Sequence, residues 1–205
     1  MQKLLTSILL IGIGMVSSSF APPTEQLTKE DRKEITKYLK KTRGELIKKV
    51  ESLTQEQWHY KPAPEVWSIA EISEHILKAE SVVLKRVDSP ETMEYKPELM
   101  EGYKEKGEEM IAFIVGRQEK FQAPDPVAPS GNIGNPDEFI TAFEKRRDET
   151  VEFVKSIDKP IKAYYEVFGP VGEVSGYHWL MFISAHTERH MIQLTEVLNS
   201  SGFPI

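Results

Sequence analysis

Apolar residues recur every three or four positions along four stretches of the chain, the spacing that places side chains on one face of an α-helix. The stretches cover residues 28–53, 68–87, 135–157 and 175–199. No stretch alternates clearly between apolar and polar residues, as a half-buried β-strand would. The pattern therefore predicts an all-α fold, a four-helix bundle with long crossover segments.

Capping residues stand at three of the expected helix starts. Thr28 followed by Asp31, and Ser68 followed by Glu71, form capping-box patterns, in which two side chains satisfy free N–H groups of the first turn. Asn135 precedes a proline at the first helical position of the third stretch. We therefore expect helices to begin at these positions, and we assign Glu71 to capping.

The connections differ in length. Residues 54–64 contain Trp58 and two prolines, which predicts an ordered connection. Residues 89–134 form a much longer excursion, with one or two helices expected within 97–121 and a proline-rich segment at 123–129 that is neither regular helix nor central strand. The excursion is too long for a simple connector, but the sequence does not reveal its role.

The N-terminus predicts the location of the protein. Residues 1–21 have the three parts of a secretory signal: a basic start at Lys3, an apolar stretch, and small residues before a cleavage site. Cleavage near Ser19 or Ala21 would leave one domain, residues 22–205. We expect an exported protein, periplasmic or extracellular, with a retained N-terminal anchor as the alternative.

Composition narrows the remaining classes of function. The formal net charge is −6 without a block of lysine or arginine, which argues against binding to nucleic acid. Apart from the leader, no stretch is apolar enough to predict a membrane span. The chain has no cysteine, so disulfides are excluded and stability must come from packing or from a metal.

Three histidines are the candidate metal ligands. His186 and His190 lie four residues apart, and therefore on one helix face one turn apart, whereas His75 shares an apolar stripe on the second helix. A lone buried histidine more often bonds an ordinary acceptor, but burying three unsatisfied imidazoles costs about 1–3 kcal/mol each, and one divalent metal would satisfy all of them. By position, His59 and His178 are not expected to be ligands.

Three polar residues lie between or just after His186 and His190. Gln193, one heptad after His186, is placed either to orient an imidazole or to be satisfied by a neighbouring helix. Arg189 could hold an anionic substrate, although we favour an interhelical salt bridge. Glu188 lies about 200° around the helix from His186, so we expect it to be solvated or structurally paired, and no general base is identified.

Several short motifs, in this order, resemble the DinB-like superfamily. They are Pro64-Glu-Val-Trp-Ser-Ile-Ala-Glu-Ile-Ser-Glu-His75, Phe121-Gln-Ala-Pro-Asp-Pro, Phe168-Gly-Pro, Trp179-Leu and His186-Thr-Glu-Arg-His190-Met-Ile-Gln193. The similarity extends from about Leu27 to Leu198. It implies a four-helix bundle in which His75, His186 and His190 bind a divalent metal.

The resemblance also implies a range of activities. Some members are S-transferases that use bacillithiol or mycothiol, and others are described as metal-dependent hydrolases. Because those thiols are cytosolic, export of this chain would fit thiol transfer poorly. We expect zinc or nickel, with iron or manganese as alternatives, and a metal-bound water as the reactive group. A small-molecule substrate and a homodimer are implied.

Two non-catalytic interpretations stay open at this point. In the first, the chain is a metal-binding or ligand-binding protein of the cell envelope, which the lack of a nearby carboxylate base favours. In the second, the metal only holds helices together.

Overall fold

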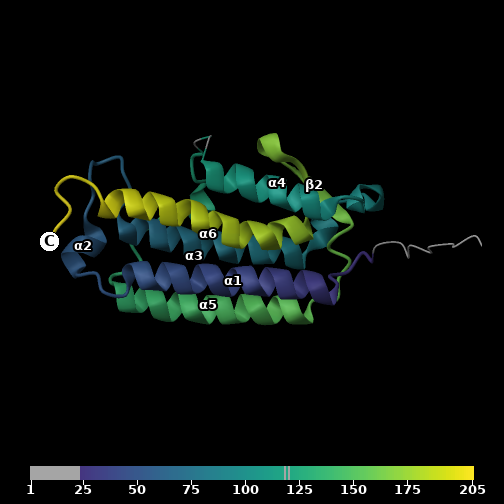
Figure 1. The fold of residues 1–205 in the computed structure, drawn as a ribbon, viewed down its shortest axis with the longest axis horizontal. Helices are drawn as coiled ribbons and strands as arrows, with labels where there is room; N and C mark the ends of the chain where they lie inside the picture. The colour runs from purple at the N-terminus through teal and green to yellow at the C-terminus, as the bar shows by residue number, and fades with distance from the viewer. Residues whose placement is uncertain (1–23, 118, 120) are drawn as a thin grey trace, which may run out of the picture.

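Four long helices lie side by side along the molecule in a computed structural model that describes residues 24–117, 119 and 121–205 (Figure 1). They are α1 (Lys29–Val50), α3 (Ile69–Asp88), α5 (Pro136–Ser156) and α6 (Gly176–Leu198). Helices α1 and α3 each contact both α5 and α6, which closes the bundle. The predicted four-helix bundle is confirmed, whereas the expected signal peptide lies outside the described residues.

Two further helices belong to the connections. The short α2 (Gln55–His59) lies in the first connection, where we expected only an ordered loop. Helix α4 (Tyr103–Gly116) forms within the long excursion and packs against α6. It carries the chain back along the bundle, so that α5 starts at the same end as α3 (Figure 1). Among the described residues, no helix combines the length and apolarity needed to cross a bilayer.

Both predicted capping boxes are present. Thr28 accepts a hydrogen bond from the Asp31 N–H at 3.1 Å, and Asp31 accepts one from the Thr28 N–H at 2.8 Å. Ser68 and Glu71 exchange the same two bonds at 3.2 and 2.7 Å. The side chain of Asn135 accepts from the N–H of Glu138 at 2.9 Å, so all three predicted starts are confirmed.

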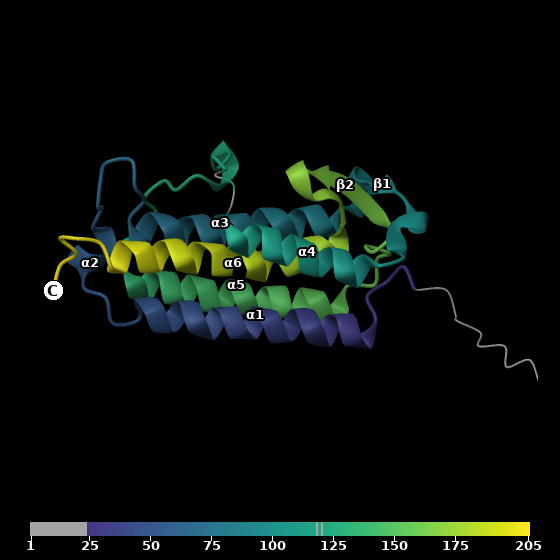
Figure 2. The same cartoon turned by 45° about the horizontal axis from the view of Figure 1, so that its top comes forward.

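A small antiparallel sheet departs from the strictly helical expectation. Its strands are β1 (Glu94–Tyr95), β2 (Tyr164–Phe168) and β3 (Gly172–Ser175), in the order β1-β2-β3. Short 3-10 turns surround them: η1 (Pro90–Thr92), η2 (Pro97–Met100) and η4 (Gly169–Val171), while η3 (Asp125–Val127) precedes α5. The sheet covers the end of the bundle where α6 begins (Figure 2). Strands this short show no usable alternation, so periodicity could not predict them.

The apolar core of the bundle consists of two clusters. Between them, Arg147 of α5 lies 3.0 Å from Glu80 of α3 and donates to Thr187 of α6 at 2.6 Å. Thr150 donates to Glu80 at 2.6 Å. Arg147 is 1% exposed, whereas its neighbour Arg146 is only partly buried. A polar layer thus crosses the middle of the bundle.

Candidate metal centre

The three candidate histidines meet in the middle of the bundle, beside the polar layer. His75 projects from α3, and His186 and His190 project from α6. The Nε2 atom of His186 lies 3.2 Å from Nε2 of His75 and 3.0 Å from Nε2 of His190. The ligand atoms of all three rings lie within 4.8 Å of one another. Residues far apart in the sequence therefore present nitrogens to one point.

Hydrogen bonds at the opposite ring nitrogens fix two of the tautomers. Nδ1 of His75 lies 2.8 Å from the carbonyl oxygen of Val127, which can only accept, so this nitrogen carries the proton. Nδ1 of His190 lies 2.9 Å from Oε1 of Gln193 and donates in the same way. In the neutral rings of His75 and His190, Nε2 is then an unprotonated lone pair.

These lone pairs cannot satisfy one another. A proton on Nε2 of His186 could be shared with only one neighbour, and at least one bare nitrogen would still face another nitrogen. A cation at the centre would satisfy all three. Two nitrogens bound at about 2.1 Å, at angles between about 90° and 110°, lie about 3.0–3.4 Å apart. The separations of 3.0 and 3.2 Å therefore fit a divalent metal.

Burial keeps the three rings neutral. His75 is 5% and His190 8% exposed, whereas His186 is less completely covered. Burial, followed by the positive charge of Lys78, lowers the pKa of His75. Burial and the two neighbouring rings lower the pKa of His186 well below its usual value, and burial together with His75 lowers the pKa of His190 to about 3. Neutral imidazole is the form that binds metals.

Aromatic side chains form the walls beside the histidines. The ring of Trp67 lies 5.0 Å from His75, and Phe182 stacks on His186 at 5.0 Å with an interplanar angle of 26°. Trp67 is thus a wall of the site, whereas Trp58 is fully buried in the core. Apolar walls exclude water around the nitrogens and strengthen electrostatic interactions there.

The flanking polar residues have structural partners. Glu188 accepts from Tyr38 at 2.9 Å and Lys41 at 2.7 Å, so it is paired away from the histidines, as expected. Arg189 donates to the backbone carbonyls of Ile114 at 3.0 Å and residue 119 at 2.7 Å, just after α4. Among the described residues, Arg189 does not form the interhelical salt bridge that we favoured. Its guanidinium instead holds the end of α4 and residue 119 just after it.

No carboxylate joins the histidine group in the described part of the chain. Glu74, next to His75, is 3% exposed, but it accepts hydrogen bonds from Ser130 and Gly131 instead. Burial raises the pKa of Glu74, but hydrogen bonds from Lys78 and from the 130–131 segment outweigh it, and the pKa falls to about 2. Glu74 is therefore a carboxylate without basic character.

The remaining histidines have other roles, as expected. Nε2 of His59 lies 2.9 Å from the carbonyl oxygen of Gly134. His178 is completely buried, accepts from the Ser175 N–H at Nδ1 and donates to the Tyr103 carbonyl from Nε2, both at 2.8 Å. It therefore caps the start of α6 and ties α4 to it.

Sequence reasoning missed the contribution of the long excursion. The carbonyl of Val127 orients His75, and Glu74 with Lys78 holds the following residues. A backbone carbonyl leaves no side-chain signal, so only the unusual length of the segment could have indicated such a role.

Comparison with known proteins places this geometry in context. A family model described as the DinB superfamily matches residues 23–194. The uncharacterized protein YuaE of Bacillus subtilis (strain 168) is 23% identical over 155 residues, which cover 76% of this chain and 91% of that protein. No solved structure matches the chain.

Proposed function

This chain belongs to the DinB superfamily, and on that premise we propose that His75, His186 and His190 hold a divalent metal that serves hydrolysis of, or group transfer to, a small molecule. The observation that carries the proposal is the convergence of three Nε2 atoms, two of them with tautomers set by Val127 and Gln193. Imidazole ligands suit zinc and nickel, with iron or manganese as further candidates.

The residues of the chain would supply binding and orientation. Three neutral ligands leave the full charge of the ion and its other coordination positions available, as in catalytic rather than closed structural sites. Such an ion supplies a Lewis acid that activates water or a thiol and polarises a carbonyl. His186 is the most exposed of the three ligands, so a substrate would approach the ion from its side.

Hydrolysis is the favoured reaction because we also propose that the protein is exported. The support is the leader-like pattern of residues 1–21, which would separate the mature chain from cytosolic thiols. A second candidate is a non-catalytic metal-binding or ligand-binding protein of the envelope. It is supported by the engagement of Glu188 and Glu74 in other contacts, which leaves no carboxylate of the described residues to act as base.

Metal content tests the ligand assignment. We expect purified mature protein to contain stoichiometric metal by elemental analysis, His186→Ala to lose it, and His59→Ala to keep it, since His59 bonds to the Gly134 carbonyl away from the site. Equal metal in His186→Ala and wild type would overturn the assignment. Turnover of esters, amides or thiol conjugates that stops on chelation would favour the enzyme over the binding protein.

A further inference from the structure

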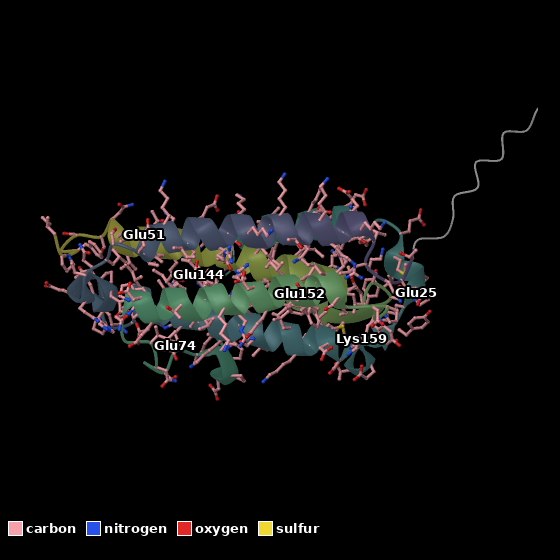
Figure 3. All side chains as sticks on the ribbon, turned by 90° about the horizontal axis from the view of Figure 1, so that it is seen from below. Glu25, Glu51, Glu74, Glu144, Glu152 and Lys159 are labelled. Atoms are coloured by element: carbon pink, nitrogen blue, oxygen red, sulfur yellow. The ribbon has the colours of Figure 1, made fainter. Side chains whose placement is uncertain are left out.

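The long excursion passes along α3 just before α5 begins. We call residues Val127–Gly131 of this segment the strap. The side chain of Val127 is buried at 7% exposure, which anchors the start of the strap. Its carbonyl accepts the hydrogen bond from Nδ1 of His75. The connection runs on the side of the bundle where Glu74 lies (Figure 3).

Glu74 holds the far end of the strap. Its carboxylate accepts from the Ser130 N–H at 3.0 Å, from the Ser130 hydroxyl at 2.8 Å and from the Gly131 N–H at 2.8 Å. Gly131 has a φ of 77°, a conformation that glycine adopts easily, and its N–H bonds to the carboxylate in this conformation. Such charge-assisted bonds in a buried place are stronger than neutral ones.

Lys78 completes the clamp. Its ammonium lies 2.9 Å from Glu74, one helical turn away, and donates to the Ala128 carbonyl and the Ser130 hydroxyl, both at 2.8 Å. Two charged side chains of α3 therefore bind both N–H and C=O groups of the strap. These bonds hold the carbonyl of Ala128 and the N–H groups of Ser130 and Gly131, and so fix the backbone that directly follows Val127.

We infer that Glu74, acting through the strap, is a positioning residue for the metal ligand His75. The two residues are adjacent on α3 and point about 100° apart, so Glu74 faces the strap while His75 faces α6. By fixing the Val127 carbonyl, the clamp holds the proton of His75 on Nδ1 and directs the bare Nε2 toward the other two rings. The metal-dependent part of this inference rests on the proposed function, whereas the tautomer does not.

Replacing glutamate by glutamine tests whether Glu74 positions His75 through the strap. In Glu74→Gln, the amide oxygen can still accept from the N–H groups of Ser130 and Gly131, but the NH₂ group replaces the oxygen that faces the Ser130 hydroxyl and the Lys78 ammonium, and the negative charge is lost. Glu71→Gln is the matched control, because Glu71 lies on the same helix but bonds to the Ser68 N–H and Lys61. A loss that appears only in Glu74→Gln cannot come from a general weakening of α3.

Two measurements are made on each variant: the tautomer of His75 by nitrogen NMR of the metal-free protein, and zinc affinity by competition with a chelator. We expect Glu74→Gln to mix the tautomers and to weaken zinc binding by about 10–100-fold, the usual effect of removing an indirect contact to a ligand. Glu71→Gln should stay within about twofold of wild type, in keeping with its position away from the strap.

An unchanged tautomer together with zinc affinity equal to that of Glu71→Gln would overturn the inference. If Glu74→Gln does not fold, Ser130→Ala decides the question, since it removes one hydroxyl donor and keeps the backbone donors. It should shift both readouts in the same direction by less, and no shift would count against the strap. If wild type binds none of zinc, nickel, iron or manganese, the proposed function fails, but the tautomer still tests Glu74.

Discussion

Acidification tests the internal cap formed by His178. Nδ1 of this completely buried ring accepts from the Ser175 N–H, and Nε2–H donates to the Tyr103 carbonyl. A second proton would turn the acceptor at Nδ1 into a donor that faces another N–H. Burial is the main cause that lowers the pKa of His178 from its ordinary 6.5 to about 4.

The sign and size of the effect follow from this shift. Between pH 6.5 and 4 the unfolded chain binds a proton at residue 178 that the folded chain does not, so stability is complete above pH 6.5 and falls as the pH drops toward 4. One pKa unit corresponds to about 1.4 kcal/mol, and the loss between about pH 7 and 4.5 is about 2 kcal/mol. His178→Gln keeps a donor and an acceptor but cannot titrate in this range.

The assay compares urea unfolding of metal-free wild type and His178→Gln from pH 7 to 4.5. The free energy of unfolding of wild type should fall by about 2 kcal/mol more than that of the variant. The other histidines titrate in both proteins, so their contributions cancel in the difference. A difference that does not change with pH would refute the neutral-cap interpretation.

Two further substitutions test the packing. Arg147→Ala should lower the free energy of unfolding in urea by about 3–5 kcal/mol, because it leaves the carboxylate of Glu80 buried without its ion-pair partner. Arg146→Ala, at the neighbouring and partly exposed position, should lower it by less than about 1 kcal/mol. Similar losses in the two variants would contradict the assignment of Arg147 as the inward residue. Gly176→Ala places a Cβ 2.7 Å from Cβ of Ile161, and this clash should lower the free energy of unfolding by about 1–3 kcal/mol in a thermal unfolding experiment. Gly44→Ala has nothing within 4 Å of its new Cβ and should raise the free energy of unfolding by up to about 1 kcal/mol. Equal effects of the two substitutions would rule out the clash.

The long helices could be predicted because all four have an apolar stripe and three of them also have a capping signal. Thr28 and Ser68 mark the starts of α1 and α3 in the sequence and in the structure alike. The choice between Arg146 and Arg147 could not be made, since steps of three and four from Phe143 both keep a residue on the inner face. The buried carboxylate of Glu80 decides it, and that is a contact between helices.

The convergence of the metal candidates was also within reach of the sequence. His186 and His190 share a helix face, and His75 lies on an inward stripe of another helix, so a bundle brings them together. The strap and the sheet could not be predicted from the sequence, because both depend on backbone groups. The strap acts through the Val127 carbonyl, and the strands of the sheet are only two to five residues long. Backbone partners are set by tertiary pairing rather than by local pattern.

His75 and His186 are 111 positions apart in the chain, and Val127 lies 52 positions after His75. A fragment produced by a cut between residues 75 and 186 would keep at most the His-x-x-x-His pair, whose affinity should be far weaker than that of the assembled trio. Tight binding of an ion would then indicate that the chain is correctly folded. Removing the ion with a chelator would lower the stability of the folded protein as well as any activity of the site.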